Sequence, residues 1–275
     1  MADIEITVDG GTSKRLLTAG KYCDRNITVT ATGGGGGEPD PPDDGKTRLY
    51  ITVPANSMPG LPPPRNEVTL CIQQSVANGV TIDWGDGNDP ETLPKTGNVN
   101  TTHTYQTAGD FVISLDPADG CELKLGYGNL YYGVLGGSGN DNKVYQNMLQ
   151  RSVIGSKGIN IIGDYTFYNY YALSSATIQD GVTSIGKNTF FGCYALSSVV
   201  IPDSVTSIES NAFFGCYGVK EYHFLPAIPP SLSSTNAFTG IPSDCIIYVP
   251  VGSLEAYQTA TNWSTYADQM QEEPA

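Results

Sequence analysis

The strongest constraint on the fold is a 23-residue repeat in the second half of the chain. Residues 162–184 read IGDYTFYNYYALSSATIQDGVTS, residues 185–207 read IGKNTFFGCYALSSVVIPDSVTS, and a diverging third copy follows. The recurring apolar positions are Ile162, Ile185 and Ile208; Phe167, Phe190 and Phe213; and Leu173, Leu196 and Val219. One copy cannot bury its apolar face alone, whereas stacked copies share a continuous core. The period therefore predicts a β-solenoid.

An earlier rung is expected before the clear copies. The aligned residues are Val153, Ala176 and Val199 in one column, and Ile159, Val182 and Val205 in another. Because neighbouring rungs with paired strands lie about 4.8 Å apart, each column should form a ladder along the solenoid.

The chain after the repeats predicts a cap. Residues 245–250 form a last expected strand, and Ser253 is expected to N-cap a helix within residues 251–275. The inner residues of this helix would be Leu254, Tyr257, Trp263, Tyr266 and Met270. A solenoid needs such an end-piece to cover its last rung.

The repeat pattern Ile-x-x-x-x-Phe-x-x-Cys-x-x-Leu-x-x-Val-x-Ile-Pro resembles the BspA-like leucine-rich repeats of bacterial surface and phage proteins. This resemblance implies a repeat domain over residues 119–250. The ending VPVGSLEAYQTATNW is similar to endings found in BspA-like proteins. The Asn ladder of better-known leucine-rich repeats is absent from the sequence, so their sites are not carried over.

A different unit precedes the repeats. Strand-like runs occupy residues 48–53, 67–72, 80–84 and 111–115. The WGDG turn that begins at Trp84, followed by His103-x-Tyr105 and a strand after Gly109, resembles the PKD-type immunoglobulin-like domain. This resemblance implies an Ig-like β-sandwich over residues 46–118, in which the WGDG turn is mainly architectural and His103 makes a structural hydrogen bond.

The start of the chain is expected to be a small β module. Residues 1–32 alternate as strands but are too few to bury a core of their own. The stretch LTAGKYCDRNITV at residues 17–29 resembles a module of phage and prophage tail-associated proteins. We expect this module to attach to other virion proteins or to a second copy. Residues 33–45, five glycines followed by EPDPPDDG, are expected to be a linker.

The charge balance narrows the partners. The formal net charge is −14, and all the excess acid lies beyond residue 32. An acidic surface repels phosphate backbones and anionic lipid, so nucleic acid is not an expected partner. Membrane insertion is not expected either, since no apolar run approaches the roughly 18 residues of a membrane span. The start, MADIEITVDG, lacks the features of a secretory signal, which favours a phage origin.

No catalytic constellation is evident. The two histidines, His103 and His223, each lie in an expected strand, and no G-x-S-x-G elbow occurs. A glycan-degrading enzyme stays an alternative, because the fold sets the separation of its carboxylates. We nevertheless expect no enzymatic activity and no cofactor. The acidic residues of the repeats are interpreted as solvated turn residues: Asp164, Asp180, Asp203 and Glu209.

Metal binding is not expected. Asp83, Asp86 and Asp89 are spaced like possible calcium ligands, but the distal bidentate Glu of a calcium loop is missing. The six cysteines include no C-x-x-C pair. Cys193 and Cys216 lie one period apart and should be in register, yet we expect both to be reduced and buried, since apolar stacking already holds the rung.

The best candidates for ligand binding are two aromatic columns. The first is Tyr171, Tyr194 and Tyr217, and beside it run Tyr168, Phe191 and Phe214. A tyrosine combines an apolar ring with a hydroxyl and suits contact with sugars or proteins. The alternative is that one column packs inward while the other covers the edge of the rung.

Together these features predict a non-enzymatic adhesion or receptor-binding protein. The first hypothesis is a phage or prophage tail-associated protein of the virion that recognises a glycan or protein of a bacterial surface through its repeats. The alternative is an extracellular BspA-like adhesin of a bacterial cell surface that binds host or community proteins.

Overall fold

The structure is a computed structural model that describes residues 44–54, 66–127, 133–136 and 147–274, and the backbone of Thr7–Val8 and Gly11–Thr12. The chain divides into two compact units, Met1–Pro42 and Asp43–Ala275. In the first unit, β1 (Thr7–Val8) pairs antiparallel with β2 (Gly11–Thr12). The rest of the predicted attachment module and nearly all of the predicted linker lie outside the described residues.

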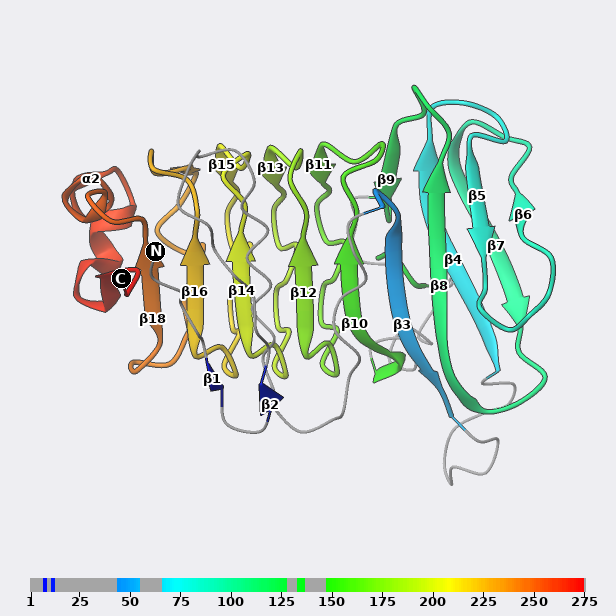
Figure 1. The fold of residues 1–275 in the computed structure, drawn as a ribbon, viewed down its shortest axis with the longest axis horizontal. Helices are drawn as coiled ribbons and strands as arrows, with labels where there is room; N and C mark the ends of the chain where they lie inside the picture. The colour runs from blue at the N-terminus through cyan, green and yellow to red at the C-terminus, as the bar shows by residue number, and fades with distance from the viewer. Residues whose placement is uncertain are drawn as a thin grey trace. The chain divides into compact units, whose positions relative to one another are not determined.

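The second unit is mainly β, as predicted, and three sheets hold its strands (Figure 1). The ten-stranded sheet runs β19 (Met270–Glu272), β18 (Ile246–Val249), β16 (Glu221–Phe224), β14 (Ser198–Ile201), β12 (Ser175–Ile178), β10 (Leu149–Ile154), β3 (Thr47–Val53), β8 (Gly109–Pro117), β5 (Val80–Asp83) and β6 (Glu91–Thr92). The four-stranded sheet runs β11 (Ile161–Ile162), β13 (Ser184–Ile185), β15 (Ser207–Ile208) and β17 (Ser231–Leu232). The three-stranded sheet runs β7 (Gly97–Thr104), β4 (Glu67–Gln74) and β9 (Leu123–Leu125).

The repeats stack as parallel rungs, each with one long and one short strand. Ala176 pairs with Val199, and Val199 pairs with Tyr222, while Ile185 pairs with Ile208 on the short strands. Every second residue of a long strand points inward and is buried. The predicted Ile, Phe and Leu columns are confirmed, since all nine side chains are at most 1% exposed. The phenylalanine ladder continues to Phe238, with stacked ring centroids 5.1–5.3 Å apart.

The first rung corrects one predicted alignment. Val153 was aligned with Ala176, but the register pairs Ser152 with Ala176 and Val153 with Thr177. The inward position of β10 is therefore held by Ser152, which is fully buried. The register between β10 and β3 shifts at Leu149 and Arg151, so the first rung has 24 residues where the next has 23. A buried serine beside an exposed-looking valine hid this shift in the sequence.

The region before the repeats contributes strands to two facing sheets. Trp84 follows β5 in the ten-stranded sheet, and its ring stacks on His103 of β7 in the three-stranded sheet, with centroids 4.8 Å apart. The buried hydroxyl of Tyr105 donates to the Trp84 carbonyl at 2.9 Å. The predicted boundary at residues 118–119 meets a further strand, because β9 pairs with β4 of this region. Its assignment as a PKD-type sandwich over residues 46–118 stays a prediction.

The cap covers the last rung but is not one helix. Helix α2 (Leu254–Thr259) is followed by the 3₁₀ helix η1 (Trp263–Gln269) and then by β19, which pairs with β18. The left-handed backbone of Asn262, at φ 66°, breaks the helix. Ser253 occupies the N-cap position but makes no side-chain cap hydrogen bond, which corrects the predicted cap. Its backbone is already in the right-handed helical region, at φ −105° and ψ −6°, rather than extended as a serine cap requires.

The inner residues of the cap are largely as predicted. Tyr257 and Trp263 are fully buried, Tyr266 and Met270 are 6% and 5% exposed, and Leu254 is partly buried. The Trp263 ring lies edge-on to Phe224 with centroids 5.0 Å apart. Met270 contributes from a strand instead of the helix expected there.

Candidate functional site

The tyrosine column forms an exposed ladder, which we call the outer ladder (Tyr171, Tyr194 and Tyr217). Ring centroids are 5.0 Å apart between the first two tyrosines and 5.4 Å apart between the last two, with interplanar angles of 19° and 22°. Tyr194 is 48% exposed and Tyr217 is 60% exposed, while Tyr171 is partly buried. The ladder therefore faces solvent instead of packing inward.

Each tyrosine sits in the turn segment that leads from a short strand to the next long strand. Backbone hydrogen bonds join neighbouring turns: the Asn169 amide donates to the Phe191 carbonyl at 2.7 Å, and the Gly192 amide donates to the Phe214 carbonyl at 2.8 Å. Gly192 has φ +70°, and a Cβ at this position would lie 2.4 Å from Asn169 Oδ1. A glycine is required here so that the turns can stack at the rung spacing.

The second aromatic column, Tyr168, Phe191 and Phe214, is partly buried. Its rings stack with both neighbouring centroid distances at 4.9 Å. The third and innermost column, which includes Phe190 and Phe213, is fully buried. Along each turn the aromatic columns thus pass from core to surface, and the outer ladder is the part that a partner can touch.

The stacking decides which atoms of the outer ladder are available. Because the rings lie nearly face to face, the faces of Tyr194 are occupied by its two neighbours, and ring edges and hydroxyls meet solvent. Burial first, and then the neighbouring Tyr194 and Tyr168, raise the pKa of Tyr171, so its hydroxyl stays protonated at neutral pH. The ladder therefore presents hydroxyl groups, at a spacing close to that of the rungs, to a hydrogen-bonding partner.

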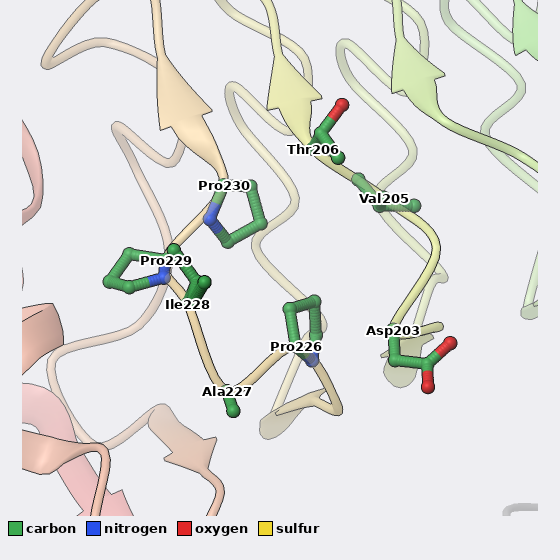
Figure 2. A pocket seen from close by; sticks show the side chains of 8 residues that line it. All are labelled: Asp203, Val205, Thr206, Pro226, Ala227, Ile228, Pro229 and Pro230. Atoms are coloured by element: carbon green, nitrogen blue, oxygen red, sulfur yellow. The ribbon is translucent and has the colours of Figure 1, made fainter.

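A second surface feature lies at the corner of the third rung. A hollow of about 380 Å³ is lined by Asp203, Val205 and Thr206 on one side and by residues 226–230 on the other (Figure 2). Ile228 in this loop is 82% exposed. Our sequence analysis did not identify this site, although the segment Pro-Ala-Ile-Pro-Pro is a signal for a rigid apolar turn.

The predicted structural role of His103 is confirmed. His103 Nε2 lies 2.8 Å from Asp86 Oδ2, and its ring is sandwiched between Trp84 and the edge of Tyr105. The aspartates of this turn are used locally, since Asp83 accepts a hydrogen bond from the Gly85 amide at 2.9 Å. Within the described ranges, no three His, Cys, Asp or Glu side chains are grouped so that they could hold a metal ion.

His223 lies on the outside of the solenoid sheet. Its Nδ1 is 2.8 Å from Glu273 Oε1, its Nε2 is 3.2 Å from Glu221 Oε2, and its ring stacks on Tyr248. Burial by itself lowers the pKa of His223, but the hydrogen bonds and charges of Glu273 and Glu221 together raise the pKa above its ordinary value. The histidine thus links the end of the chain to β16.

The cysteines of the repeats are free thiols, as predicted. Cys193 and Cys216 are fully buried, and their Sγ atoms donate to the carbonyls of Phe167 and Phe190 at 3.1 and 3.2 Å. Burial raises the pKa of Cys216 to about 12, which keeps it a thiol at neutral pH. The predicted turn residues Asp164, Asp180 and Asp203 are exposed, and Glu209 is half-buried.

Comparison with protein families identifies residues 141–249 as a BspA type leucine-rich repeat region with six copies. This match confirms the repeat resemblance, whereas the PKD-type and phage-tail resemblances stay predictions. The comparison with curated proteins found no match. Repeats of this type form a family with binding and adhesion roles and are typical of surface and extracellular proteins. None of the helices in the described part of the chain is long and apolar enough to cross a membrane.

Proposed function

We propose that this chain is a non-enzymatic adhesion protein that binds a bacterial-surface glycan or protein through the outer ladder. The observation that carries the proposal is the exposure of Tyr194 and Tyr217 within a stacked aromatic column. Contiguous exposed aromatic surface lowers solubility, and where it occurs it tends to mark an interaction site. The BspA type repeat region, whose family has binding and adhesion roles, supports the same function class.

The stacking supports a particular kind of contact. A sugar ring that packs flat on an aromatic residue needs an open ring face, and the middle ring of the ladder has none. A partner that accepts hydrogen bonds from a row of hydroxyls and packs on ring edges fits better. Protein backbone carbonyls and sugar hydroxyls both meet this requirement.

Two biological settings fit this binding role. The resemblance at residues 17–29 supports a phage or prophage tail-associated protein of the virion, and the BspA type repeats support an extracellular adhesin. The genes beside this one separate the two settings: tail genes support the first, and sortase or secretion genes support the second.

Replacing Tyr194 by Ala tests the proposal. The full-length protein and the variant are titrated onto a panel of intact bacterial cells, and the binding constants on the cells that bind are compared. We expect the substitution to weaken binding about tenfold, as for a central interface residue. The melting temperature should change by only a few degrees, because the side chain is half exposed.

Two control variants sharpen this experiment. Val76→Ala changes another exposed apolar side chain, at 48% exposure, in the region before the repeats and should leave binding unchanged. Tyr194→Phe keeps the stacked ring but removes the hydroxyl, so it should lose part of the affinity. A loss of about 3 kcal/mol in folding stability on Tyr194→Ala would instead assign the ladder to packing. Unchanged binding with unchanged stability would reject the proposal.

A further inference from the structure

Ile228 is an unusual apolar residue because the fold holds it in water. It is 82% exposed, the highest value among the large apolar side chains in the described part of the chain. It lies in a corner that is one residue longer than the one before: Ile201 pairs with Phe224, 23 residues on, whereas Ser207 pairs with Ser231, 24 residues on. The extra residue lets residues 226–230, which we call the proline loop, bulge from the solenoid.

The proline loop is clamped from beneath by the cap. The hydroxyl of Tyr257 donates to the Pro226 carbonyl and the indole nitrogen of Trp263 donates to the Pro230 carbonyl, both at 2.7 Å. Both donor side chains are fully buried. Three prolines also fix backbone φ angles within the loop. The exposed tip is therefore preorganised, and a partner that contacts it pays little of the usual cost of ordering a loop.

The surroundings indicate which partner the loop fits. The hollow beside it is apolar along Val205 and the prolines, and it is large enough for one or two side chains (Figure 2). Asp203 lies at its rim, and Asp180 occupies the equivalent position one rung earlier; both are exposed. The chain as a whole has a net charge of −14. This charge opposes binding to a second copy or to an anionic lipid surface.

We propose that the proline loop and its hollow form a second binding site, for a protein segment that presents an apolar side chain next to Lys or Arg. The apolar side chain fills the hollow against Ile228, and the basic residue lies near Asp203. This arrangement has the form of a binding hot spot, with an apolar anchor and a charged rim. The site uses no residue of the outer ladder, and it stands or falls independently of the proposed function.

An array of synthetic hexapeptides tests this site on the full chain. Each peptide carries one central Trp, Leu or Ser, flanked by Arg, Gln or Glu. We expect the strongest binding for Trp or Leu flanked by Arg. Ile228→Ser should weaken that signal at least fivefold with an unchanged melting temperature, because the side chain is exposed. Asp203→Asn should reduce the preference for Arg over Gln while keeping the preference for Trp over Ser.

Matched variants separate this site from the rest of the surface. Val76→Ser and Tyr194→Ala, each at 48% exposure in the parent, should leave the array pattern unchanged. Equal binding by the parent and Ile228→Ser, or equal binding of Arg-flanked and Glu-flanked peptides, would overturn the proposal. Dimerisation in light scattering that Ile228→Ser abolishes would also overturn it, because the occupant would then be a second copy.

Discussion

Left-handed backbone positions recur once per rung in the turns of the solenoid. Asn188 and Asn211 have φ 54° and 56°, and Tyr165, at the equivalent position one rung earlier, has φ 58°. Asparagine tolerates this conformation, whereas a residue with a bulky side chain does so at a cost of about 1–2 kcal/mol. The Tyr165 ring partly offsets the strain through an edge contact with Tyr168, with centroids 5.6 Å apart.

Replacing Tyr165 by Asn is therefore expected to stabilise the protein. The free energy of unfolding should rise by about 0.5–1 kcal/mol, since the relief of backbone strain exceeds the loss of one edge contact. Denaturant titration of the variant measures this change. Asn211→Ala, which introduces the strain at an equivalent position, should lower the free energy of unfolding by about 1 kcal/mol. A loss of stability in both variants would show that the Tyr165 contact outweighs the strain.

At the scale of elements, the cap is tied to the solenoid sheet by an ion-pair cluster. His223 on β16 is faced by Glu221 of its own strand, by Tyr248 of β18 and by Glu273 just after β19. Because the carboxylates raise its pKa in the folded state, protonation of His223 stabilises the fold. This contribution is complete below the ordinary histidine pKa of about 6.5 and is lost as the pH rises through the raised value.

The cluster predicts a pH dependence that belongs to His223. The free energy of unfolding of the parent should exceed that of His223→Gln at acidic pH, and the difference should shrink as the pH rises through the raised histidine pKa. Urea titrations at a series of pH values measure it. Glu273→Gln removes one of the two partners and should reduce the dependence. A difference between parent and His223→Gln that is constant with pH would show that the ring matters only for its stacking on Tyr248.

The elements that the sequence predicts best are those with repeated apolar positions. The columns through Phe190 and Leu196 follow from the 23-residue period alone, because like residues must stack to bury a core. Sequence periodicity could not place the first rung, where Ser152 occupies a core position. The break at Asn262 was equally hidden, since an asparagine in a left-handed conformation leaves the apolar spacing of the cap unchanged.

The candidate site was predictable in its residues but not in its geometry. The sequence identified Tyr194 and Tyr217 as a column, yet only the fold shows that they face solvent with their rings stacked. The proline loop depends on two hydrogen bonds from the cap, from Tyr257 and Trp263, across about 30 residues of sequence. Contacts of this range leave no periodic signal.

At the scale of the whole second unit, one sheet joins the repeats to the region before them. Strand β3 pairs antiparallel with β10, so that Leu49 lies opposite Ser152 (Figure 1). The Gly155 amide donates to Thr47 Oγ1 at 3.0 Å, and the Lys157 ammonium contacts Asp116 at 2.8 Å. The first rung is thereby covered by the preceding strands, as the last rung is covered by the cap. A solenoid with both ends covered can leave its turns, and the outer ladder on them, free for binding.

The central claim is that the outer ladder is the contact surface, and side-chain oxidation footprinting tests it most directly. The full chain is oxidised free in solution and again when bound to the bacterial cells identified by the titration, and the reactivity of each tyrosine is compared. We expect Tyr194 and Tyr217 to lose most of their reactivity on binding, while Val76, which is equally exposed, keeps its own. Unchanged reactivity of both tyrosines in the bound protein would contradict the claim.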